Sequence, residues 1–164
     1  MVTRTALFFC GTLTIATAAC SDTDTGPMSM TSPSAAYDVS VAPSSVVLAP
    51  ASVFGGFDAS SCLMFGATFD LVVKNFGASD LFLDEATFQL IDGTTLGGPM
   101  IPMPSRDLNR RFGQLLIHRG RTRAFRFQER FGCGARRPQW LRVDARLVSS
   151  GGDSSYATVE VPTN

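Results

Sequence analysis

The sequence predicts an all-β fold for residues 37–164, an antiparallel sandwich of two sheets. Apolar and polar residues alternate with a period of two in several short runs, as in strands that bury one face. No segment shows a sustained helical period, and turn-forming pairs such as Asp92-Gly93 and Arg119-Gly120 separate the runs. The chain contains 13 phenylalanines but only two tyrosines and one tryptophan, which indicates an interior filled by phenylalanine. This length suffices for one domain with a substantial core.

In chain order, the strands expected from the alternation are residues 37–41, 45–48, 65–74, 86–90, 115–118, 125–128, 141–148 and 156–161. The clearest is 141–148, where every second residue from Leu141 to Leu147 is apolar and the residues between them are charged. The run Ser150-Gly151-Gly152-Asp153 follows it and is typical of a turn. We therefore expect 141–148 and 156–161 to form a terminal hairpin.

Residues 93–113 break the pattern. They contain three prolines and four glycines, a composition that excludes a central strand or a long helix. At most one helical turn is expected, at residues 105–111. Because a connection this long inside a compact domain is usually functional or disordered, we expect an ordered flap over the sandwich.

Residues 1–19 are expected to form a signal peptide. Arg4 precedes a short apolar centre, and small residues occupy positions 16–19. The apolar stretch is too short for a stable membrane span. Residues 20–36 are rich in Ser, Thr, Asp, Pro and Gly, and such a segment is expected to form a disordered tether.

Cys20 follows Ala18-Ala19, and this end of the signal peptide resembles the lipobox of bacterial lipoproteins. The resemblance implies that the Cys20 thiol is lipidated and anchors an exported protein to the membrane of the cell envelope, facing the periplasm or in the outer membrane. Thr17 stands where the lipobox usually carries an aliphatic residue. Ordinary cleavage after Ala16-Thr17-Ala18 and an uncleaved anchor remain the alternatives.

The remaining cysteines are consistent with export and lipidation. Cys10 would leave with the signal peptide and Cys20 would take the lipid, so Cys62 and Cys133 remain as an even pair. In an oxidising compartment they are expected to form a disulfide, with two free thiols as the alternative. His118 is the only histidine and no Cys-x-x-Cys motif occurs, so the sequence predicts neither a metal site nor a cofactor.

Two short motifs resemble immunoglobulin-like domains of bacterial envelope proteins. Residues 72–77 (Val-Val-Lys-Asn-Phe-Gly) followed by 81–83 (Leu-Phe-Leu) look like the strand, Asn-x-Gly turn and strand of those domains. Residues 116–122 resemble a later turn of the same domains, with Arg119 where proline is common. The resemblance implies an immunoglobulin-like sandwich, a fold that hosts many unrelated functions.

Charge is distributed unevenly along the chain. Residues 20–105 carry nine acids and one base, whereas residues 106–146 carry twelve arginines and three acids. The arginines could be solvated strand faces that pair with acidic strands. Alternatively, five of them gather on one rim formed by the 93–113 flap and the 131–138 turn, and bind an anionic envelope polymer or an acidic protein. These five are Arg106, Arg110, Arg111, Arg136 and Arg137.

The sequence predicts no enzyme. His118 precedes a turn, where a solvated role is expected, and no Gly-x-Ser-x-Gly elbow accompanies it. Asp84 and Glu85 are expected on opposite faces of a strand. The compartment and the lack of basic motifs interleaved with aromatic residues argue against nucleic acid. We therefore expect a non-catalytic, membrane-anchored binding module, with a protease inhibitor presenting residues 93–113 and a hydrolase using His118 as alternatives.

Overall fold

The computed structural model describes residues 29–30, 36–50, 64–92, 100–132 and 138–164. These residues form ten strands and one helix. In chain order the elements are β1 (Ser29–Met30), β2 (Tyr37–Ala42), β3 (Leu48–Pro50), β4 (Phe65–Asn75), β5 (Leu81–Ile91), β6 (Ile101–Pro104), α1 (Ser105–Phe112), β7 (Leu116–Ile117), β8 (Thr122–Phe131), β9 (Trp140–Ser149) and β10 (Ser154–Pro162).

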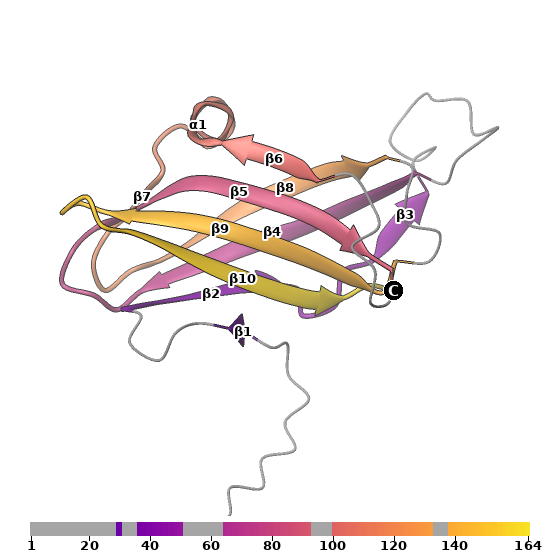
Figure 1. The fold of residues 1–164 in the computed structure, drawn as a ribbon, viewed down its shortest axis with the longest axis horizontal. Coiled ribbons are helices and arrows are strands. Elements are labelled where there is room, and N and C mark those ends of the chain that lie inside the picture. The colour runs from indigo at the N-terminus through magenta and orange to yellow at the C-terminus, as the bar shows by residue number, and fades with distance from the viewer. Residues whose placement is uncertain (1–28, 31–35, 51–63, 93–99, 133–137) are drawn as a thin grey trace, which may run out of the picture.

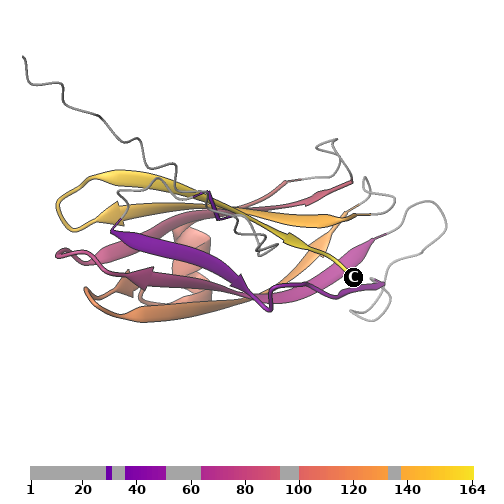
Figure 2. The same cartoon turned by 90° about the horizontal axis from the view of Figure 1, so that it is seen from below.

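The strands form two antiparallel sheets that face each other (Figure 1). One sheet has the order β1-β10-β9-β5-β6, with β7 also paired to β5. The other is built around β4, which pairs with β8 on one side and with β2 and β3 on the other. Figure 2 shows the sheets as two layers. The predicted two-sheet sandwich is confirmed, including the terminal hairpin of β9 and β10.

Phenylalanine fills the centre of the sandwich, as the composition predicts. Phe69, Phe88 and Phe127 are at most 1 % exposed and come from β4, β5 and β8. Their ring centroids lie 4.6–5.7 Å apart, within the usual range for aromatic pairs. Because β4 and β8 belong to one sheet and β5 to the other, this cluster joins the two layers.

Residues 101–112 of the expected flap are ordered, but they form an edge strand and a two-turn helix where at most one helical turn was expected. β6 tolerates Pro102 and Pro104 because it is an edge strand. On its free side no neighbouring strand pairs with the backbone, so a missing N–H costs little. In α1, Leu108 is fully buried and Phe112 packs against Phe125 and Phe127 of β8. The helix closes the side of the sandwich between β6 and β8 (Figures 1 and 2).

A β-bulge in β5 corrects the placement expected for Asp84 and Glu85. The register shifts between Leu83 and Glu85, so Leu83 and Ala86 both point into the core although three positions separate them. Asp84 and Glu85 are both half-buried rather than on opposite faces, and Asp84 forms an ion pair with Arg146 at 3.4 Å. An alternating pattern cannot reveal an extra residue of this kind.

Three shorter elements also differ from their expected bounds. The strand predicted at 45–48 lies at β3, and Val46 instead makes an isolated bridge to Thr163. The strand predicted at 115–118 shortens to β7. Within the predicted tether, Ser29 and Met30 form β1, which pairs with Val159 and Thr158 of β10. Backbone pairing, for which the tether composition gives no signal, therefore holds this part of the chain.

Candidate functional site

The arginines predicted to share one rim have different surroundings. Arg106 and Arg110 are exposed on α1, where Arg110 forms an ion pair with Asp107 at 3.3 Å, one turn away on the same helix. Such an exposed pair contributes little to stability. The guanidinium groups of Arg106 and Arg110 therefore both remain accessible. Arg136 and Arg137 lie outside the described residues.

Arg111 differs from Arg106 and Arg110, because its guanidinium group is paired with a carboxylate of β8 although the residue as a whole is exposed. It donates to Glu129 of β8 and lies 5.2 Å from the ring of Phe127 and 5.5 Å from that of Phe112. The side chains of Arg111 and Glu129 are 32 % and 11 % exposed. Glu129 shares the inward face of β8 with Phe127 and Phe131, a position that strand alternation could have revealed.

Removing one partner of this pair should destabilise the fold more than removing both. We expect Glu129→Ala to cost about 2 kcal/mol, because it leaves the half-buried Arg111 cation against aromatic rings without its carboxylate. This value lies below that for a fully buried pair because water still reaches Arg111. The double variant Arg111→Met/Glu129→Leu should recover most of the lost free energy of unfolding, as measured by chemical denaturation.

The exposed pair offers the matched control. Asp107→Ala should change the free energy of unfolding by less than about 0.5 kcal/mol, since Arg110 keeps its hydration when the carboxylate is lost. Equal losses for Glu129→Ala and Asp107→Ala would contradict a structural role for the Arg111–Glu129 pair.

Other arginines extend the basic character along β8. Arg126 and Arg130 are exposed on its outer face, and Arg126 stands opposite Asp70 in the ladder with β4. Arg123 is tied down, since its guanidinium donates to the carbonyl of Leu116 at 2.9 Å and lies 4.8 Å from the ring of Phe125. The α1–β8 side of the sandwich therefore carries several accessible cations.

The opposite sheet supports the alternative interpretation for its own arginines. Arg142 pairs with Asp144 at 3.1 Å and with Glu160 at 4.0 Å, and Asp144 also accepts a hydrogen bond from Thr158. Arg146 pairs with Asp84. These contacts are solvated strand-face pairs of the kind that the alternation predicts.

Asn75 organises the connections at one end of the sandwich. Its buried side-chain amide donates to the carbonyl oxygens of Ser79 and Ile117, and its Oδ1 accepts the N–H of Gly77. Gly77 allows a close approach, because a Cβ there would lie 2.9 Å from the Cβ of Ala36. The Asn-x-Gly motif thus links the β4–β5 loop to the chain before β2 and to β7.

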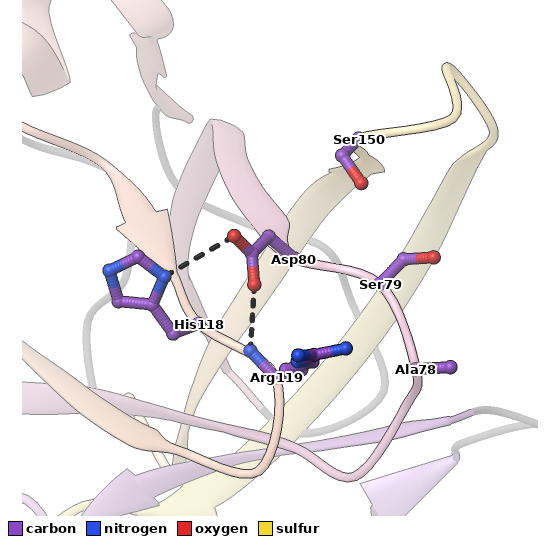
Figure 3. Close-up of a pocket in the computed structure, with 6 residues that line it drawn as sticks. All are labelled: Ala78, Ser79, Asp80, His118, Arg119 and Ser150. Atoms are coloured by element: carbon purple, nitrogen blue, oxygen red, sulfur yellow. Dashed lines mark hydrogen bonds and ion pairs between the residues drawn. The ribbon is translucent and has the colours of Figure 1, made fainter.

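Asp80 joins this loop to two further connections (Figure 3). Its Oδ1 accepts the backbone N–H of Arg119 at 2.9 Å, its Oδ2 lies 3.2 Å from Nδ1 of His118, and its carbonyl accepts the N–H of Ser150. The hydrogen bond from the Arg119 backbone lowers the pKa of the Asp80 carboxyl. Partial desolvation opposes this change, whereas His118 and the charge of Arg119 reinforce it. Asp80 is therefore a carboxylate at neutral pH.

Two adjoining pockets lie at this end. The first has a volume of about 550 Å³ and the second about 630 Å³. They meet at Ala78 and Ser79, which line both. The first is also lined by Asp80, His118, Arg119 and Ser150, and the second includes Tyr37, Asp153, Ser154, Ser155 and Tyr156. This grouping could not be predicted from the sequence, because its members come from connections far apart in the chain.

The first pocket does not assemble a serine triad. A triad needs a hydroxyl beside the imidazole nitrogen that Asp80 does not contact. In Figure 3, Ser79 and Ser150 lie on the side of Asp80 away from the His118 ring. Within the described ranges, no group of three or more His, Cys, Asp or Glu side chains is arranged to hold a metal ion.

The protease-inhibitor alternative needs residues 93–113 to protrude as a loop. Residues 101–112 are instead packed onto the sandwich as β6 and α1, and residues 93–99 lie outside the described part of the chain. The segment available for presentation is therefore much shorter than the alternative assumed.

Cys20, Cys62 and Cys133 also lie outside the described residues. The neighbouring ladder bears on the predicted disulfide, because Phe65 pairs with Phe131 at the end of β4 and β8. Cys62 is three positions before Phe65 and Cys133 two positions after Phe131. The disulfide itself therefore stays a prediction.

No protein-family model and no curated protein matches this chain. Among solved structures, it is similar to a structural-genomics target, SoR45, with a TM-score of 0.53 and 9 % identity, over 78 % of this chain and 86 % of that chain. It is also similar to a Bordetella pertussis protein described as ApaA, with a TM-score of 0.46 and 19 % identity, over 77 % of this chain and 86 % of that chain. The likeness to SoR45 extends to the fold alone.

Among the described residues, no helix is long and apolar enough to cross a membrane.

Proposed function

We propose that this chain is an exported lipoprotein of the bacterial cell envelope, whose immunoglobulin-like sandwich binds a partner without catalysis. The observation that carries the binding role is the end of the sandwich where Asn75 and Asp80 fix three connections around two adjoining pockets. Connections held by hydrogen bonds lose little freedom on binding, which favours recognition.

The partner is an envelope protein or polymer that carries negative charge. The exposed arginines include Arg106 and Arg110 on α1, Arg119 in the turn before β8, and Arg126 on β8. A surface of this kind attracts anions over about 10 Å at 0.1 M salt, so binding should weaken as the salt concentration rises.

The N-terminal segment supports anchoring close to the membrane. β1 is held on β10, so nine positions separate Cys20 from the sandwich. At 3.3–3.6 Å per residue, they span at most about 30 Å. A lipid on Cys20 would therefore keep the sandwich close to the membrane surface.

Lipidation of Cys20 is directly testable. In cells fed radiolabelled palmitate, the wild-type chain should carry label and sediment with membranes, because several acyl chains anchor stably. Cys20→Ala should lose the label and move to the soluble envelope fraction. Cys10→Ala is the matched control and should keep both properties.

An unlabelled wild-type chain would contradict the lipoprotein assignment. Its mature mass would then distinguish cleavage after Ala18 from an uncleaved anchor. The binding role is tested separately, by crosslinking in intact cells followed by pull-down of the wild-type chain.

A further inference from the structure

We infer that the two adjoining pockets form one binding site for an anionic saccharide, with a sugar ring on Tyr156 and its acidic group on Arg119. This inference rests on the proposed binding function and names the ligand class and the residues that would recognise it. The two pockets meet at Ala78 and Ser79, so a ligand of two or three sugar rings can occupy both.

The tyrosine pocket offers the surface that a sugar ring requires. Tyr156 is 70 % exposed where β10 begins, and the half-buried Tyr37 lines the same pocket. One face of a pyranose ring presents C–H groups, which pack on an aromatic face, while its hydroxyls point to the rim. A tyrosine supplies both the apolar face and a hydroxyl group.

The rim of this pocket carries hydrogen-bonding groups suited to sugar hydroxyls. Asp153, Ser154 and Ser155 line it, and carboxylates accept while serine hydroxyls both donate and accept. Ser149 has a different role, since its Oγ accepts the backbone N–H groups of Gly151 and Asp153 and so shapes the turn. The turn that forms this rim is therefore held in shape by its own hydrogen bonds.

The neighbouring pocket supplies the positive charge. Asp80 is engaged by the backbone of Arg119 and by His118, and among the described residues no carboxylate forms an ion pair with the Arg119 guanidinium group. Figure 3 shows this group directed away from His118, on the side of Ala78 and Ser79. Arginine beside serine hydroxyls is suited to a carboxylate or a phosphate.

A saccharide fits this lining better than an acidic peptide does. The polar groups around the two pockets are tyrosine and serine hydroxyls, the Asn75 amide, the His118 imidazole, one guanidinium and two carboxylates. Leu81 is the one large aliphatic residue among the lining residues. Peptide side chains need apolar pockets for affinity, whereas sugar hydroxyls need many short polar groups around an aromatic face.

The test is calorimetric titration of the full chain, purified in detergent, with trigalacturonate, which carries an acid on each ring. Trigalacturonate should bind saturably. Maltotriose, which lacks the acid, should bind at least tenfold more weakly, and acetate, which lacks the ring, should not saturate. Glucuronate and glucose 6-phosphate then show whether the acid group is a carboxylate or a phosphate, and binding of either supports the site.

Two substitutions locate the site. Tyr156→Ala and Arg119→Ser should each lower the affinity for trigalacturonate at least fivefold, because each removes one half of the recognition. Arg142→Ser, the same charge change on the polar face of β9 and outside both pockets, should stay within twofold of the wild type. Thermal melts of all three variants check that the fold is intact.

Several results would overturn the inference: no saturable binding of trigalacturonate at millimolar concentration, equal binding of acetate, equal binding of triglutamate, or unchanged affinity in both pocket variants. If the pocket variants still pull down the envelope partner as the wild type does, the saccharide site is wrong while the binding role stands. If the wild type captures no partner, the proposed function itself fails.

Discussion

Replacing Phe127 with alanine is expected to lower the free energy of unfolding by about 3–5 kcal/mol, the usual cost of emptying a buried aromatic site. Phe127 is fully buried and contacts Phe69 of its own sheet, Phe88 of the other sheet and Phe112 of α1. These aromatic partners are held by two sheets and a helix, so they cannot move in to refill the space.

Urea denaturation followed by circular dichroism measures this effect. Phe76→Ala is the matched control, because Phe76 is 69 % exposed and its loss should change stability by no more than about 0.5 kcal/mol. Similar midpoints for the two variants would mean that the phenylalanine cluster does not join the layers.

Loss of the Cys62–Cys133 disulfide is expected to cost roughly 2–5 kcal/mol. The bridge would close a loop of about 70 residues, and a closed loop of this length lowers the entropy of the unfolded chain. Phe65 and Phe131 pair at one end of the β4–β8 ladder. In the sequence, Cys62 lies three positions before Phe65 and Cys133 two positions after Phe131.

The disulfide can be tested by mass and by stability. Alkylation of the unreduced exported protein should label neither Cys62 nor Cys133, and reductant should lower the wild-type midpoint to that of Cys62→Ala/Cys133→Ala. The double variant itself should not respond to reductant. Two alkylated thiols in the unreduced protein would refute the bridge and leave the free-thiol alternative.

Much of the fold follows from local pattern. Strands such as β9 and β10 alternate in polarity residue by residue, and this alternation indicates which face each strand buries. The turn at residues 150–153 joins the two strands. The phenylalanine content likewise predicts the interior. These properties depend on near neighbours in the chain. They can be predicted because every strand of a sandwich buries one face, whatever its position in the sheet.

Local pattern failed where an element depends on a distant partner. β6 and α1 were expected as a flap because proline and glycine dominate that segment, yet an edge position tolerates Pro102, and burial of Leu108 stabilises the helix. The bulge at Asp84 is set by pairing with β9. Packing of α1 against β8 brings Arg111 to the buried carboxylate of Glu129, a contact that local pattern could not predict.

The sequence by itself determined the all-β class, the phenylalanine core, the terminal hairpin and the polar faces of the arginine-bearing strands. Only the tertiary structure decided which side chains meet at the loop end. Asp80, Arg119 and Tyr156 belong to three separate connections or strand ends, and each is unremarkable among its own neighbours in the chain. Sheet packing brings such residues together at one end of a sandwich, and spacing along the chain carries no record of that arrangement.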